Sequence, residues 1–167
     1  LADVFAIQSE IAKAIADQLQ AKLSSREKAA IERPPTGDVT AFDLYTHAKN
    51  LLLPTIFSAT GRADLMQAAD LLSQAVARDP SFFDAYCQLA HAHDLLYFYA
   101  YDRSATRLTS AEAAVQAASR LRPDAGETHL ARARNLYWGH RDYDGALREL
   151  ELGRRSLPND PQIFELM

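Results

Sequence analysis

The chain has 167 residues, enough for a core within one domain, and its hydrophobic fraction of 48% and charged fraction of 24% are those of an ordinary globular protein. A net charge of −4 at pH 7 argues against a nucleic-acid partner, although every Lys or Arg after position 102 is an arginine, which indicates a local arginine-lined surface. One cysteine excludes an intramolecular disulfide and a multi-cysteine metal site. The longest apolar run, residues 95–101, is too short to insert into a membrane, and no signal-peptide pattern precedes it.

Residues 1–32 form the first expected unit, an amphipathic helical segment. Its apolar residues step by four and form one stripe, which consists of Ile7, Ile11, Ile15, Leu19 and Leu23. Such a stripe must find a surface, and the candidates are the first repeat, a groove, or a second copy of the chain, which would give a homo-oligomer. Two prolines and a glycine then predict a linker over residues 33–39.

After the linker, apolar residues recur at helical spacing and strand signals are almost absent, which predicts an all-α fold. The expected helices span residues 41–53, 62–79, 82–100, 104–121, 125–139, 143–156 and 161 onward. Their starts are assigned to capping residues, namely Thr40, Ser81, Thr109, Asp124 and the pair Asp160-Pro161. Their stops are assigned to Pro54, Pro80, Pro123 and Pro158.

An internal repeat organises the chain from residue 40 to 158. Three segments share a small residue, an apolar residue four positions later, a small residue three after that, and proline after five more. They are Ala68/Leu72/Ala75/Pro80, Ala111/Val115/Ala118/Pro123 and Ala146/Leu150/Gly153/Pro158. Small residues at this spacing let neighbouring helices approach closely, so we expect Ala75, Ala118 and Gly153 at helix contacts. Each segment follows another amphipathic helix, so the unit is a helix hairpin.

This pattern resembles the tetratricopeptide repeat family, with Tyr137, Ala146, Leu150, Gly153 and Pro158 giving the fullest match. The resemblance implies a right-handed superhelix of antiparallel helix hairpins, with three repeats over residues 40–158 and the start of a truncated fourth over 159–167. The chain departs from the family pattern in longer connections near 54–61 and 96–103. It also departs at Arg134, where a small residue is usual, so the helix that contains it is expected to be shifted by one residue.

The front of the chain carries a second resemblance. The run from Leu1 to Ile11 is similar to the end of a TolB-like domain, which in bacterial regulatory proteins precedes tetratricopeptide arrays. Such proteins sometimes carry a nucleotide cyclase or a DNA-binding transcription activator. The chain begins with Leu1 and ends within an expected helix, so we interpret it as a segment of a longer protein. A soluble domain is expected, cytoplasmic by default and periplasmic if its parent protein is anchored in a membrane.

No catalytic motif is recognisable, so the sequence predicts neither an enzyme nor a bound cofactor. His91 and His93 point about 200° apart on a helix and therefore cannot share a metal ion. Cys87 and His91 have the spacing of a nucleophile and its base, but a small buried cysteine is the commoner reading. We expect no metal site.

The resemblance implies that the first helices of successive hairpins line a concave groove that binds a partner. Carried over by position, the groove residues are Tyr45, Lys49, Leu52, Gln88, His91, Leu95, Arg132, Asn135 and Trp138. Lys49 and Arg132 would bind a carboxylate of a peptide. This face is alternatively only solvated, or filled by the helix of residues 3–23. The aromatic run 97–101 either packs on the first hairpin or forms a lip that contacts ligand.

Two functions follow. The leading one is a protein- or peptide-binding scaffold within a bacterial regulatory or signalling protein. The alternative is a small-molecule sensor domain that controls an attached nucleotide cyclase or transcription activator. An open polar groove favours the peptide, whereas a closed apolar cavity near residues 97–101 favours the small molecule.

Overall fold

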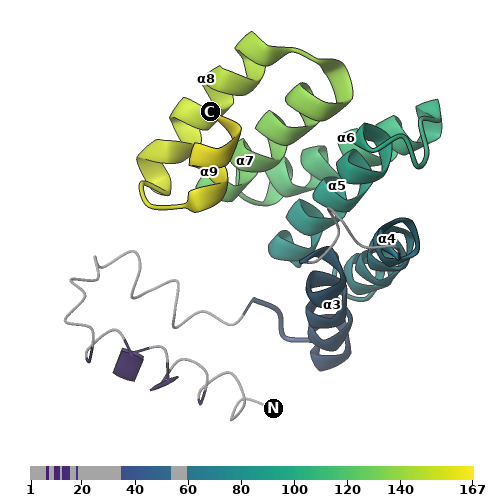
Figure 1. Ribbon diagram of the computed structural model, residues 1–167. Coiled ribbons are helices and arrows are strands. Elements are labelled where there is room, and N and C mark those ends of the chain that lie inside the picture. The colour runs from purple at the N-terminus through teal and green to yellow at the C-terminus, as the bar shows by residue number, and fades with distance from the viewer. Residues whose placement is uncertain (1–6, 8–9, 12, 16–17, 19–34, 54–59) are drawn as a thin grey trace.

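The computed structural model describes residues 7, 10–11, 13–15, 18, 35–53 and 60–167. These residues form helices joined by short connections, and no strand occurs among them, which confirms the all-α class (Figure 1). The named elements are α3 (Val39–Leu52), α4 (Gly61–Arg78), α5 (Phe83–Phe98), α6 (Ala105–Leu121), α7 (Gly126–Arg134), η1 (Asn135–His140), α8 (Tyr143–Ser156) and α9 (Pro161–Leu166). Their bounds lie within one or two residues of the expected helices, except where η1 continues α7.

The helices pack as successive hairpins. Helix α3 pairs with α4, α5 with α6, and α7 with α8, and α9 then packs on α7 and α8. From one hairpin to the next, α3 contacts α5, α5 contacts α7, and α7 contacts α9, whereas α4 does not contact α6, nor α6 α8. The row is therefore curved, with α3, α5, α7 and α9 on its inner side (Figure 1).

Small residues hold the helices of each hairpin together. Ala75 and Ala118 are fully buried, and Ala118 packs against Phe83 and Cys87 of α5. A Cβ atom added at Gly153 would lie 3.3 Å from the backbone oxygen of Gly126, so α8 approaches α7 more closely than most side chains allow. The expectation that Ala75, Ala118 and Gly153 sit at helix contacts is confirmed.

The helix caps differ from those expected, except at Asp160, whose side chain accepts a hydrogen bond from the Gln162 N–H. Asp38, Ser104 and Asp142 cap α3, α6 and α8. The assignments of Thr40, Ser81, Thr109 and Asp124 as caps are wrong. At α3 and α6 a nearby polar residue supplies the cap in place of the expected one, and pattern alone does not choose between them. Helices α5 and α7 have Phe82 and Ala125 at the N-cap position and no side-chain cap.

Thr109 and Ser81 were predicted as caps, but their hydroxyls form other hydrogen bonds. Thr109 lies inside α6, where its hydroxyl donates to the Ala105 carbonyl oxygen at 3.0 Å. Ser81 precedes α5, and its hydroxyl donates to the Asp79 carboxylate at 2.6 Å. Both hydroxyls are satisfied by local partners, so neither is available to cap a helix.

The predicted linker 33–39 is structured over its described part. The Thr36 hydroxyl is buried and donates to the Asp79 carboxylate, and Asp38 forms an ion pair with Arg78 at 2.9 Å. Residues 35–38 therefore dock on the C-terminal end of α4, and Val39 already belongs to α3.

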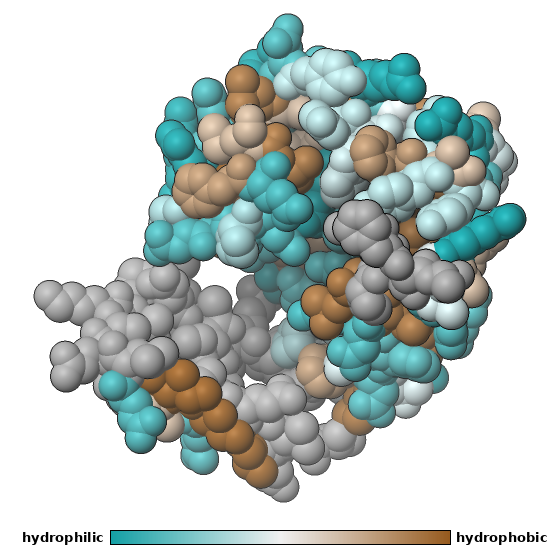
Figure 2. Space-filling model, viewed as in Figure 1, coloured by the Kyte–Doolittle hydropathy of each residue, from teal (hydrophilic) through white to brown (hydrophobic). Residues whose placement is uncertain are grey.

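The N-terminal stripe is described at three of its five residues. Ile7, Ile11 and Ile15 are helical and 53%, 54% and 53% exposed, and Figure 2 shows a brown apolar strip where the purple helical pieces lie in Figure 1. The packing expected on the first hairpin or the groove is therefore not seen at these residues. Leu19 and Leu23 lie outside the described residues, and contact with a second copy stays a prediction.

Candidate binding site

An aromatic cluster centred on Trp138 occupies the inner side of the row. The His91 ring stacks on the indole with 5.6 Å between ring centroids and 15° between planes, and the Phe98 ring lies 5.7 Å away. The Tyr137 ring meets the indole edge-on at 6.5 Å. Helix α5 supplies His91 and Phe98, and η1 supplies the other two rings. Contacts between the second and third hairpins thus build the cluster.

The local backbone explains how Trp138 reaches this position. The predicted helix 125–139 is α-helical only to Arg134 and continues as the π-helix η1, a wider turn that rotates the following side chains relative to an α-helix. It ends at Arg141 in the left-handed conformation, with φ 57°, after which the Asp142 N–H bonds the Leu136 carbonyl oxygen at 2.9 Å. The one-residue shift expected for this helix at Arg134 stays a prediction.

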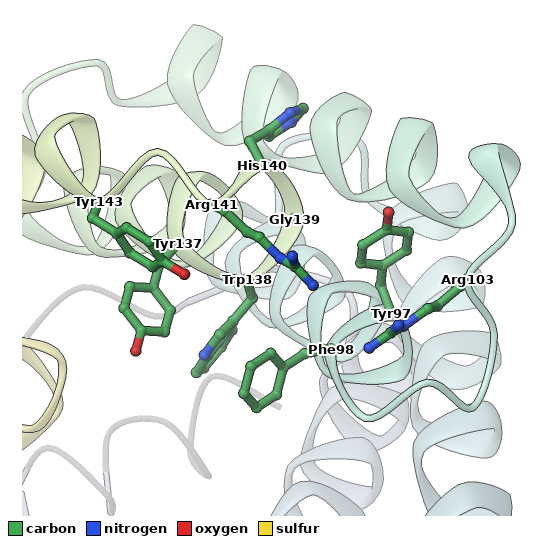
Figure 3. A pocket seen from close by; sticks show the side chains of 9 residues that line it. All are labelled: Tyr97, Phe98, Arg103, Tyr137, Trp138, Gly139, His140, Arg141 and Tyr143. Atoms are coloured by element: carbon green, nitrogen blue, oxygen red, sulfur yellow. The ribbon is translucent and has the colours of Figure 1, made fainter.

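One pocket opens on the side of the cluster nearer the ends of α5 and η1. We call it the Arg103–Arg141 pocket; its volume is about 320 Å³. It is lined by Tyr97, Phe98, Arg103, Tyr137, Trp138, Gly139, His140, Arg141 and Tyr143. Figure 3 shows the side chains of Arg103 and Arg141 approaching from opposite sides toward Tyr97 and Phe98. Both arginines are exposed, and no ion pair joins either of them to a residue that the structure describes.

A second pocket opens on the other side of Trp138, between the inner helices. We call it the Arg134 pocket; its volume is about 420 Å³. It is lined by Leu52, Leu53, His91, Leu95, Phe98, Tyr99, Arg134, Tyr137, Trp138, Gln162, Glu165 and Leu166. Residues from α3, α5, α7, η1 and α9 meet here, so the pocket exists only because the hairpins stack.

Arg134 is the buried charged group among the residues that line this second pocket. Its side chain is 6% exposed, its guanidinium carbon lies 5.9 Å from the Trp138 ring centroid, and its Nε has no hydrogen-bond partner among the described residues. Burial lowers the pKa of Arg134 to about 10, so the group stays protonated at neutral pH. Burial also holds the pKa of His91 well below 6.5, so this imidazole is neutral.

The structure brings together four of the residues predicted for the groove. Leu52, His91, Leu95 and Trp138 all line the Arg134 pocket. Tyr45 instead packs on Phe82 with 4.9 Å between ring centroids, and Lys49 lies over the Tyr45 ring at 5.5 Å. Gln88 is half-buried in α5 and lines none of the pockets described here.

Arg132 and Asn135 lie apart from that group. Both line a different depression, between α6, η1 and α8. The Arg132 Nε donates to the Ser119 hydroxyl at 3.1 Å, and its Nη1 lies 3.9 Å from the Glu149 carboxylate. The Asn135 amide donates to the Asp94 carboxylate at 2.9 Å. Internal partners therefore already engage both side chains, and neither shares a pocket with Trp138.

Asp94, on α5, is a second ionisable group that is buried. It is fully buried; one carboxylate oxygen accepts from Asn135 and the other has no hydrogen-bond partner among the described residues. Burial raises the pKa of Asp94 to about 7, and Glu112 of α6 acts in the same direction. The Asn135 hydrogen bond and the Arg134 charge oppose this rise without cancelling it.

Several site residues escaped the sequence analysis. Arg134 was noted only as a departure from the repeat pattern, Arg141 and Tyr143 belong to a turn that matches the repeat, and none of these residues or Arg103 was predicted for a site. A charged residue in place of a small one was the available signal for Arg134. For Arg103 and Arg141 the only signal was the arginine bias of the second half of the chain, and Tyr143 had no signal for a site.

The structure bears on three possibilities that the sequence raised, namely a cysteine nucleophile, a metal site and a membrane-spanning helix. Burial raises the pKa of the Cys87 thiol, which opposes formation of a thiolate nucleophile. Across the described residues, no three His, Cys, Asp or Glu side chains are grouped to hold a metal ion. In that same part of the chain, no helix is both long and apolar enough to cross a membrane.

Compared with known proteins, the sequence matches no protein-family model and no curated protein.

Proposed function

We propose that the chain is a non-catalytic scaffold of tetratricopeptide type that binds a partner protein or peptide along the inner side of its helix row. The observation that carries this proposal is the aromatic cluster at the meeting point of the inner helices. Stacked hairpins whose first helices face one surface are the arrangement that repeat scaffolds use for binding. The resemblance of its front end to a TolB-like domain supports placing the scaffold in a bacterial regulatory protein.

The chemistry of the cluster favours a mixed apolar and acidic partner. Trp138 and Tyr137 offer large ring surfaces, and tryptophan, tyrosine and arginine are the residues that most often dominate binding energy at interfaces. The exposed Arg103 and Arg141 add two positive charges beside these rings. An extended segment with an aromatic or aliphatic side chain next to Asp or Glu fits this surface.

A peptide library selected on the intact chain tests the proposal. Selected peptides should be enriched in acidic and apolar residues, and Trp138→Ala should weaken their binding by at least about tenfold in fluorescence anisotropy. The double variant Arg103→Ala/Arg141→Ala should weaken binding less at high salt than at low salt, because salt already screens the charges it removes. Arg120→Ala, an exposed change on α6, is the matched control and should bind like wild type.

Two results would contradict the proposal. One is a library that yields no binder. The other is a set of peptides whose affinity is the same for Trp138→Ala and wild type, since the binding surface would then lie elsewhere. Circular dichroism of each variant verifies that a loss of binding is not a loss of fold.

The second candidate function is a small-molecule sensor domain that regulates an attached cyclase or transcription activator. The observation that favours it is the Arg134 pocket, whose volume lies in the range of small-ligand sites. In this function a ligand would bridge the inner helices and bias how the hairpins stack.

A further inference from the structure

Arg134 is buried, and no described carboxylate pairs with it at contact distance, although Asp160, Asp94 and Glu165 act on its charge from farther away. Arginine is almost never fully buried unless it is paired, because an isolated ion loses its hydration when it leaves water. No carboxylate of the described residues lies within ion-pair distance of Arg134, and its Nε makes no hydrogen bond there. A group aimed into a pocket under these conditions is set to receive an anion from outside the chain.

The pocket walls restrict the charge of that anion. Among the described lining residues, Arg134 is the only cation and Glu165, which is exposed, the only anion. His91 is neutral. A single guanidinium balances one negative charge, and the nearby Glu165 carboxylate would repel a second one. A monocarboxylate therefore fits better than a phosphate.

The same walls restrict the shape of the ligand. Rings and aliphatic side chains line most of the pocket, with His91, Phe98 and Trp138 on one side and Leu95 and Leu166 among the rest. A flat apolar body removes these surfaces from water and gains from ring contacts. The volume of about 420 Å³ accommodates one small molecule at the low end of the range for ligand sites.

We propose that the Arg134 pocket binds a small monocarboxylic acid with a flat apolar body, whose carboxylate accepts hydrogen bonds from the Arg134 guanidinium while its ring lies against the Trp138 cluster. This assignment rests on the sensor candidate and names its ligand class. It does not require the inner surface to bind a peptide, so a failed peptide selection leaves it standing.

Trp138 is the only tryptophan of the chain, so its fluorescence reports directly on the pocket. The intact chain is titrated with phenylacetate, benzoate and cyclohexylacetate, and with phenylacetamide as the neutral counterpart of the first. At least one acid should change the Trp138 emission saturably, with half-saturation below about 1 mM, and phenylacetamide should bind at least about tenfold more weakly. Absence of saturable binding by all three acids, or equal binding of acid and amide, overturns the proposal.

Three variants locate the charge that the acid recognises. Arg134→Met removes the guanidinium and keeps the length of the side chain, so acid binding should fall by at least about tenfold; replacing an unpaired buried charge should not weaken the fold. Arg132→Met, two residues earlier and in a different depression, should bind like wild type. Glu165→Gln should tighten binding a few-fold, because it removes the charge that repels the ligand.

Equal acid binding by Arg134→Met and wild type, or weaker binding by Glu165→Gln, overturns the assignment. Glu165→Gln changes an exposed residue, so it keeps the test valid if Arg134→Met fails to fold. A peptide that ends in phenylalanine and binds more tightly than phenylacetate, through its free terminal carboxylate, would overturn the assignment to a free acid. The source of the carboxylate would then be a chain end.

Discussion

The contact surfaces between the two helices of each hairpin, called here seams, consist of small and apolar residues. The contact between the second and third hairpins, called here the inner wall, contains buried ionisable residues as well. The seams contain alanine, glycine and leucine, and Ala75, Ala118 and Leu72 are completely buried there. The inner wall holds Asp94 and Arg134, two buried ionisable groups that each leave a polar atom without a described partner. Seams of this kind account for stability, whereas the wall retains groups that cost stability.

This difference separates the residues that packing alone explains from those that it does not. A buried apolar seam needs no explanation beyond packing, but an unsatisfied buried charge persists only if something else requires it. Both unsatisfied groups lie beside the second and third inner helices, where the aromatic cluster also lies. Stability measurements on seam and wall variants should therefore change in opposite directions.

The largest effect is expected at the seam of the second hairpin. Ala118→Leu forces extra atoms between α6 and the Phe83 and Cys87 side chains of α5, and should destabilise the protein by about 1–3 kcal/mol in urea unfolding. Ala113→Leu, an exposed change on the same helix, should have little effect. Equal urea midpoints for the two variants would mean that the seam is not tightly packed.

An intermediate effect of opposite sign is expected at the wall. Between its ordinary pKa of 3.8 and its raised pKa of about 7, Asp94 keeps a proton in the native state that it loses on unfolding, so its contribution to stability falls as pH rises. Asp94→Asn does not titrate and still offers an oxygen to Asn135. It should be about 1–2 kcal/mol more stable than wild type at pH 8, with no advantage near pH 4.

Urea unfolding of Asp94→Asn and wild type across this pH range measures the difference directly. Other carboxylates, such as Asp38, change stability equally in both proteins and cancel in the comparison. A gap that does not change between pH 4 and pH 8 would show that Asp94 is ionised in the native state or already compensated.

The smallest effect is expected at Ala100, in the connection between α5 and α6. Ala100 follows α5 in the left-handed conformation, with φ 60°, and the Tyr101 N–H bonds the Leu96 carbonyl oxygen at 3.0 Å. Glycine adopts this conformation without strain, so Ala100→Gly should stabilise by about 0.5–1 kcal/mol. Ala113→Gly, within α6, should destabilise by a similar amount in the same thermal melts. A lower melting temperature for Ala100→Gly would refute the assignment of strain.

Local pattern in the sequence was sufficient for the helices and their seams. The spacing of Ala68, Leu72, Ala75 and Pro80 recurs three times, and periodicity together with proline stops places each helix within one or two residues. These features depend on neighbours along the chain, so they are readable from it. The cap predictions failed at α3 and α6 because nearby polar residues compete, and at α5 and α7 because these helices start without a side-chain cap.

The binding site was decided by tertiary structure. Arg134 and Trp138 face one pocket because a π-helix follows Arg134 and because α3, α5 and α9 close around the result. Arg132, predicted for the same groove, instead lies in another depression against Ser119. Arg132 and Arg134 are two residues apart on α7, so they point about 200° from each other and only one of them can face the pocket. Which one does is set by how the neighbouring hairpins fit together in space, and no local pattern records that choice.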